Sequence, residues 1–172
     1  MSGWTPWYAR LIALAAVLVS AGRLQGQEPT PEQQVWAAVI QARGDGVVLE
    51  ERTSSQWMSG VPRDVPADAW ASFLEANREP VALRDHLLPH PSVRFESDVP
   101  DAAEGDCRSR RTLLLSRVGF SADGTLAVVS VGGAVGAGPY PGCGYAWSDT
   151  VLMRRSADGT WRTVRMLGGF IT

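Results

Sequence analysis

Apolar residues gather in two pairs of short stretches near the C-terminal end of the chain. Leu113–Val118 and Leu126–Val131 form the first pair, and Thr150–Arg155 and Trp161–Leu167 form the second. The same five letters, Ser-Ala-Asp-Gly-Thr, join the two members of each pair. Asp-Gly between β-prone stretches is a strong signal for a β-hairpin. The sequence therefore predicts two hairpins, each with a glycine at positive φ near the end of its turn and an aspartate bonded to the turn backbone.

The strands of the first pair are apolar at nearly every position rather than at alternate positions. A strand of that kind is covered on both sides and lies inside a sheet. We therefore expect an α+β fold, in which two or three helices cover one face of a C-terminal antiparallel sheet of about four strands.

Two helices are predicted before the sheet. Thr30 has the place of an N-cap, with Pro31 at the first helical position and Gln33 at the third. Apolar residues follow at helical spacing, and Gly44 ends the helix. The second helix is expected from about Ala67 to Arg78, with an apolar stripe along one side.

Three further segments have weaker patterns. Val47–Thr53 is β-prone and is expected to form a first strand. Val81–Leu88 is expected to add one or two helical turns, because nearby prolines rule out a long helix. Val93–Phe95 is expected to be a short extended piece.

The first residues have the pattern of an export signal. Met1–Arg10 ends in a positive charge, and the apolar run Leu11–Gly22 is too short for a helix that spans a membrane. Small residues allow cleavage after Ala21 or after Gly26. We therefore expect a signal peptide within residues 1–26, the general secretory route and a single domain over residues 27–172. An uncleaved signal anchor is the alternative.

Export sets the expected state of the two cysteines, Cys107 and Cys143. In an oxidising compartment two cysteines most often pair, and a disulfide closing such a loop stabilises by about 3–4 kcal/mol. Two free thiols are the alternative. The cysteines and the two histidines do not have the spacing of a zinc site, so no metal is expected.

Charge excludes one class of partner. All basic residues are arginine, and the formal net charge is −2. Removal of the signal would take away Arg10 and Arg23 and leave the domain more acidic. An acidic domain lacks the basic surface that binds nucleic acid. Contact with a membrane is expected only through the signal segment before cleavage.

Gly132–Gly144 contains six glycines. A phosphate-binding loop would end in Lys-Ser/Thr or open a helix, and this segment has no lysine and has prolines at 139 and 141. We therefore interpret it as a long link between two strands, and no cofactor is expected.

His86 and His90 are the two histidines, spaced four residues apart. Pro89 lies between them, and no glutamate stands where a zincin motif requires one. A small hydrolase that uses His86 or His90 with a carboxylate is the enzymatic alternative, which requires a histidine, an acid and a nucleophile to converge.

A series of positions from Val35 to Trp161, which includes Trp70, Phe73 and Asn77 of the second helix, resembles a known group of sequences. Ser116-Arg-Val-Gly-Phe120, followed by a glycine-rich link and by Gly159-Thr-Trp161, is similar to small exported bacterial proteins with an S-R-V-G-F-N hairpin and a terminal Gly-x-Trp strand. Ser121 stands where that group usually has asparagine. The resemblance implies export and architecture but no activity, and it marks Arg117 and Asn77 as the polar positions to watch. The structural alternative for Arg117 is an inward arginine paired with an acid.

These observations favour a non-catalytic binding or interaction module of the cell envelope or extracellular space. Its partner would be a protein or a small ligand. The expected site is a groove between helices and sheet, near Arg117 and the glycine-rich link, with Asn77, Tyr140 and Tyr145 as further candidates.

Overall fold

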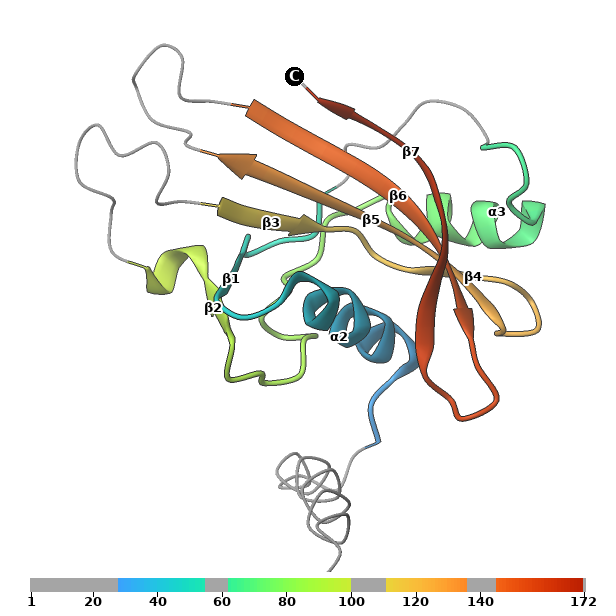
Figure 1. Ribbon diagram of the computed structural model, residues 1–172, viewed down its shortest axis with the longest axis horizontal. Helices are drawn as coiled ribbons and strands as arrows, with labels where there is room; N and C mark the ends of the chain where they lie inside the picture. The colour runs from blue at the N-terminus through green and yellow to red at the C-terminus, as the bar shows by residue number, and fades with distance from the viewer. Residues whose placement is uncertain (1–27, 55–61, 100–110, 136–144, 172) are drawn as a thin grey trace, which may run out of the picture.

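The computed structural model describes residues 28–54, 62–99, 111–135 and 145–171 of the chain. These residues form two α-helices and a mostly antiparallel sheet, so the fold is α+β (Figure 1). In chain order the elements are α2 (Pro31–Arg43), β1 (Val47–Leu49), α3 (Ala67–Ala76), β2 (Val93–Phe95), the 3-10 turn η2 (Glu96–Asp98), β3 (Arg111–Leu115), β4 (Gly119–Phe120), β5 (Leu126–Val135), β6 (Tyr145–Arg155) and β7 (Trp161–Ile171).

The sheet has seven strands, not the expected four or so. The strands run in the order β2-β1-β3-β5-β6-β7, and β4 also pairs with β5. β1 pairs in parallel with β2 and β3, whereas the other pairs are antiparallel. That the short N-terminal strands join the C-terminal sheet could not be predicted from local patterns, because parallel pairing needs no tight turn between the partners.

The first helix begins as predicted. The Thr30 hydroxyl accepts a hydrogen bond from the Gln33 backbone at 3.2 Å, and the Gln33 side chain accepts one from the Thr30 backbone at 2.8 Å. Four apolar side chains of α2 are buried: Val35, Trp36, Val39 and Ile40.

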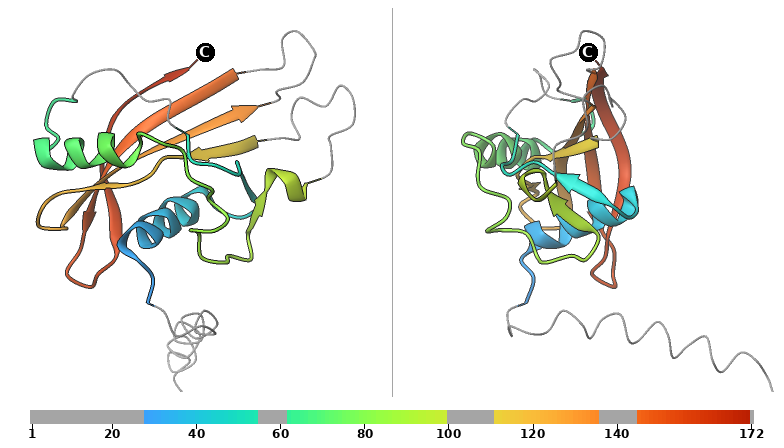
Figure 2. Two further views of the ribbon diagram at one scale, coloured as in Figure 1. Left: turned by 180° about the vertical axis from the view of Figure 1, so that it is seen from behind. Right: turned by 90° about the vertical axis from the view of Figure 1, so that its left-hand side faces the viewer.

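The helices cover opposite faces of the sheet, which corrects the expectation that they share one face. Along β5, Ala127, Val129 and Val131 belong to the core under α2, while Val128 packs with Trp70 of α3. In Figure 1 α3 lies behind the strands, and turning the molecule round brings it to the front (Figure 2). This placement explains why β5 is apolar at successive positions, since each side chain meets a helix on its own side.

Both hairpin turns have the predicted geometry. Gly124 and Gly159 have φ of 66° and 83°, and the backbone N–H of each donates to the carbonyl oxygen of the serine three residues earlier. Asp123 and Asp158 each accept a backbone hydrogen bond at 3.0 Å from the threonine that ends the turn. The aspartates therefore hold their own turns.

β5 continues into the segment that the sequence analysis assigned to a link. A Cβ on Gly133 would lie 2.5 Å from Nε1 of Trp147, and one on Gly132 would lie 2.9 Å from the Trp147 carbonyl oxygen. Gly132 and Gly133 are therefore strand residues on which a tryptophan packs, and they do not belong to a flexible loop. No helix in the described ranges is long and apolar enough to cross a membrane.

Candidate functional site

The segment between β3 and β4 connects the sheet to both helices. Trp36 of α2 donates its indole N–H to the Ser116 carbonyl oxygen at 2.8 Å. The Ser116 hydroxyl accepts from the Ser130 backbone at 2.8 Å and donates to the Arg117 carbonyl oxygen at 2.6 Å. The chain therefore leaves β3 without losing its hydrogen bonds to the sheet.

Arg117 pairs with an acid. Its Nε and Nη2 atoms lie 2.8 and 2.9 Å from the two carboxylate oxygens of Glu32, in the first turn of α2. The same carboxylate accepts the Val118 backbone N–H at 3.0 Å. The hydrogen bond from Glu32 raises the pKa of the Arg117 guanidinium above its usual value. This is the structural alternative that the sequence analysis left open for Arg117.

Asn77 meets the same segment from the other helix. Its Oδ1 atom accepts the Arg117 backbone N–H at 2.8 Å, and its Nδ2 atom donates to the carbonyl oxygens of Arg117 and Phe73. Asn77 is buried at the C-terminal end of α3. The two polar positions marked by the resemblance are thus brought together, but the contacts of both are contacts within the fold.

Gly119 and Phe120 complete this segment. A Cβ on Gly119 would lie 2.2 Å from the backbone nitrogen of Phe73, so α3 packs directly on the strand backbone. Phe120 is also hydrogen-bonded to α3, since its backbone N–H donates to the Ser72 hydroxyl oxygen at 3.1 Å. Its ring lies against Trp161, with centroids 5.8 Å apart. We call residues 116–120 the clamp segment.

The remaining ligand-binding candidates lie elsewhere. Tyr145 is the first residue of β6, where its backbone pairs with Val135. Tyr140 lies outside the described residues, as do Cys107 and Cys143. The ligand role of the tyrosines and the disulfide therefore stay predictions.

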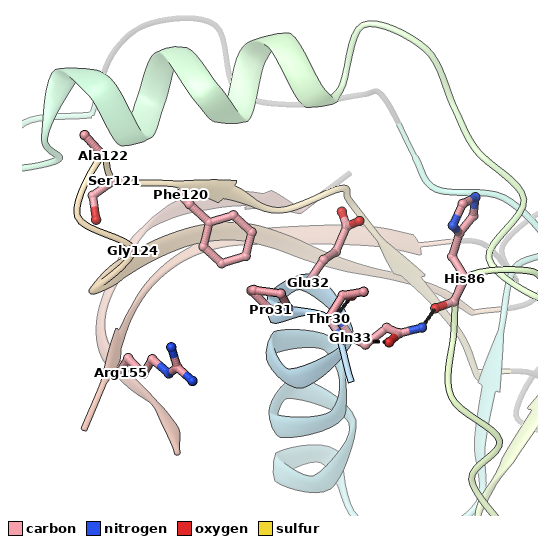
Figure 3. A pocket seen from close by; sticks show the side chains of 10 residues that line it. All are labelled: Thr30, Pro31, Glu32, Gln33, His86, Phe120, Ser121, Ala122, Gly124 and Arg155. Atoms are coloured by element: carbon pink, nitrogen blue, oxygen red, sulfur yellow. Dashed lines mark hydrogen bonds between the residues drawn. The ribbon is translucent and has the colours of Figure 1, made fainter. Parts of the chain in front are cut away.

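A cleft opens beside the clamp segment. It has a volume of about 480 Å³ and lies between the first turn of α2, His86 and the turn from β4 to β5 (Figure 3). Its size is within the range of small-molecule sites, about 300–1,000 Å³. Arg117 does not line this cleft, although its partner Glu32 does. The lining residues are Thr30, Pro31, Glu32, Gln33, His86, Phe120, Ser121, Ala122, Gly124 and Arg155.

The two ends of the cleft differ in charge. Arg155, the last residue of β6, points toward the first turn of α2, and it has no ion-pair partner within the described ranges (Figure 3). The Glu32 carboxylate is directed away from Arg155 and is bound to Arg117. The ring of Phe120 lies between these two charges in Figure 3. The cleft thus offers an apolar surface next to a cation that no described acid pairs with.

The histidines do not assemble a catalytic triad in the described part of the chain. His86 is exposed at the rim, where its carbonyl oxygen accepts from the Gln33 side chain at 2.7 Å. His90 is also exposed, and its Nδ1 atom accepts from the Ser92 backbone at 3.2 Å. The Ser92 hydroxyl donates to Asp45 at 2.9 Å, so the acid contacts the serine directly and the histidine does not stand between them. In a catalytic triad the histidine lies between the serine and the acid and is hydrogen-bonded to both.

Metal ligands are likewise not gathered at one place. Among the described residues no group of three or more histidine, cysteine, aspartate or glutamate side chains is placed to hold a metal ion.

No protein-family model matches the chain, and no match was found among curated proteins or solved structures. The resemblance of the chain to small exported bacterial proteins therefore stays a prediction.

The sequence analysis missed Phe120 and Arg155 as site residues. The register of the strands brings them together: Phe120 pairs with Ala127, Ala127 pairs with Met153, and Arg155 is two residues further along the same strand. Because residues two apart in a strand share a face, Phe120 and Arg155 lie on one side of the sheet. That deduction requires the strand pairing, which local sequence does not supply.

Proposed function

We propose that this protein is an exported, non-catalytic binding module that uses the cleft between α2 and the β4–β5 turn. Its place would be the periplasm or the extracellular space, as the export pattern of residues 1–26 implies. The protein would act by holding a ligand or a partner's side chain, not by transforming it.

One observation carries this proposal: the cleft joins a ring, Phe120, to a cation, Arg155, that has no ion-pair partner among the described residues. A binding site typically combines an apolar lining with a few polar groups that fix the ligand's orientation. Arg117 is paired with Glu32, and the Asn77 side chain is hydrogen-bonded to the Arg117 backbone, so we assign the ligand role to the cleft instead of these two residues.

The hydrolase alternative gains no support from the histidines' contacts. Its test is direct: the purified chain is assayed with ester, phosphate and glycoside chromogenic substrates, beside a variant with both His86 and His90 changed to alanine. Turnover that disappears in this variant would establish an enzyme and contradict the proposal.

The binding function is tested by a fragment screen on the chain from residue 27 onward, monitored by ¹⁵N–¹H NMR. We expect binding fragments to shift the amides of Gln33, Phe120, Ala122, Gly124 and Arg155 together. Fragments that bind only at other surfaces, or a library that shifts no cleft amide, would contradict the proposal.

Export and the disulfide have their own test. A bacterial host should release a chain that begins at residue 22 or 27, as found by intact mass. In that product a thiol assay under denaturing conditions should find neither Cys107 nor Cys143 free. A chain that keeps its first residues, or one with two free thiols, would contradict the corresponding part of the proposal.

A further inference from the structure

We propose that the cleft selects a small organic carboxylate that carries a flat apolar group, with the carboxylate at Arg155 and the flat group on Phe120. This inference rests on the proposed function and specifies the chemistry of its ligand.

The charge of the ligand follows from the charged groups at the cleft wall. Glu32, His86 and Arg155 are the titratable residues that line it. Glu32 is neutralised by two short hydrogen bonds from Arg117, and its carboxylate is directed away from the cleft's cationic end. Arg155 is left as a full charge with no ion-pair partner among the residues that the structure describes. A guanidinium with no partner favours an anion, and its planar fork matches a carboxylate.

Acids near the same turn do not cancel this charge. Asp68 belongs to α3, on the opposite face of the sheet, and accepts the Ala122 backbone N–H at 2.7 Å. Asp123 accepts hydrogen bonds from Ser121 and Thr125 within its own turn. Neither residue lines the cleft.

The positive end of α2 adds to the preference for an anion. Pro31, at the first helical position, has no N–H, and the Gln33 N–H is already capped by Thr30. The helix terminus also contributes through its dipole. It strengthens the field around Arg155 without supplying a separate anion site.

The apolar part of the ligand follows from Phe120. Its ring lines the cleft and packs against the buried Trp161, with ring centroids 5.8 Å apart, and this contact restrains the ring. A supported ring offers a flat surface on which an aromatic or other planar group stacks. A volume of about 480 Å³ suits a ligand with one ring and a short acid arm rather than a large cofactor.

The test uses two probes of the same shape, the anion phenylacetate and the neutral phenylacetamide, in ¹⁵N–¹H NMR titrations at pH 7. We expect phenylacetate to shift the cleft amides with a dissociation constant about tenfold lower than that of phenylacetamide, because a charge-assisted hydrogen bond is about twice as strong as a neutral one. Arg155→Gln should remove this tenfold advantage. Arg154→Gln removes the same charge from the opposite side of β6 and should leave it unchanged.

Each other result overturns the inference. Equal affinity of the two probes at the cleft would contradict selection for a carboxylate while leaving the cleft as a binding site. Shifts confined to surfaces outside the cleft, or no shifts with phenylacetate, would contradict the assigned ligand chemistry, and the fragment screen would then decide separately whether the cleft binds anything. An Arg155→Gln variant that keeps the full advantage would also overturn it.

Discussion

Glu32 and Arg117 are held together by two N–H···O hydrogen bonds of 2.8 and 2.9 Å, although 85 residues separate them in the chain. The pair joins the first turn of α2 to the clamp segment between β3 and β4. Only 30% of the Arg117 side chain and 17% of the Glu32 side chain are exposed. At this depth the pair is more than a solvated surface contact, and it fixes where α2 begins on the sheet.

Replacing the acid of this pair should destabilise the fold. Glu32→Gln removes the charge and one of the two acceptors for Arg117, and we expect it to lower the free energy of unfolding by about 1.5–2 kcal/mol. Glu75→Gln is the matched control: its partner Arg78 lies 2.7 Å away, but both side chains are mostly exposed, so the loss should stay below about 0.5 kcal/mol. Urea unfolding at pH 7 measures both. Equal losses in the two variants would contradict the clamp role of the pair.

Two glycines near the first hairpin should respond to alanine for different reasons. Gly119→Ala places a methyl group 2.2 Å from the Phe73 nitrogen, and the resulting overpacking should cost about 3 kcal/mol or more. Gly124 has open space around it but a φ of 66°, so Gly124→Ala should cost only about 1–2 kcal/mol. Thermal unfolding followed by circular dichroism ranks the two. A smaller effect at Gly119 than at Gly124 would mean that α3 does not rest on the strand backbone.

Two buried tryptophans should tolerate phenylalanine unequally. Trp36→Phe removes an indole N–H that donates to the Ser116 carbonyl oxygen at 2.8 Å. The variant loses both buried volume and a hydrogen bond, so its free energy of unfolding should fall by about 3 kcal/mol. The Trp161 N–H is buried and has no partner among the described residues. Trp161→Phe removes that unsatisfied donor together with some volume, so its cost should be about 1 kcal/mol or less. Chemical denaturation of the two variants tests the order, and a larger loss at Trp161 would contradict it.

The second hairpin turn should show its hydrogen bonds in a pH titration. Bonds from the Thr160 hydroxyl and backbone and from the Ser156 hydroxyl lower the pKa of Asp158 from 3.8 to about 2. A lowered pKa means that the folded protein holds the charged form more tightly than the unfolded chain does. The stabilisation is therefore complete above about pH 4 and is lost as the pH falls through about 2.

Carboxyl ¹³C shifts measure this titration. Thr160→Val removes the largest cause of the shift and should raise the pKa of Asp158 toward its usual value. The pKa of Asp123, which is lowered by Ser121 and Thr125 in the first turn, should not change and is the internal control. A wild-type midpoint for Asp158 near 3.8 would contradict the described turn geometry.

The parts of the fold that sequence could predict are those with local causes. Thr30 and Gln33 cap α2 because their spacing alone sets the contact. Gly124 and Gly159 occupy the positive-φ positions that their Asp-Gly turns require. In each case the partners lie within a few residues of one another, so the pattern carries the geometry.

Features that depend on contacts between segments far apart in the chain could not be predicted from the sequence. The number of strands was underestimated because β1 pairs in parallel with segments that follow it much later in the chain, Val93–Phe95 and Arg111–Leu115. The helices were expected on one face, since nothing local to Trp70 shows which side of β5 it will cover. The cleft could not be predicted for the same reason: Phe120 and Arg155 come together only through the register of β4, β5 and β6.

The central claim is that Arg117 stabilises the fold while Arg155 is free to serve a ligand. The most direct test is the free energy of unfolding of Arg117→Met and Arg155→Gln, measured side by side by urea denaturation at pH 7. Arg117→Met should lose about 2 kcal/mol, because it leaves the Glu32 carboxylate without its partner, and Arg155→Gln should stay within about 0.5 kcal/mol of the wild type. A loss at Arg155 as large as that at Arg117 would contradict the account, because both arginines would then be holding the fold together.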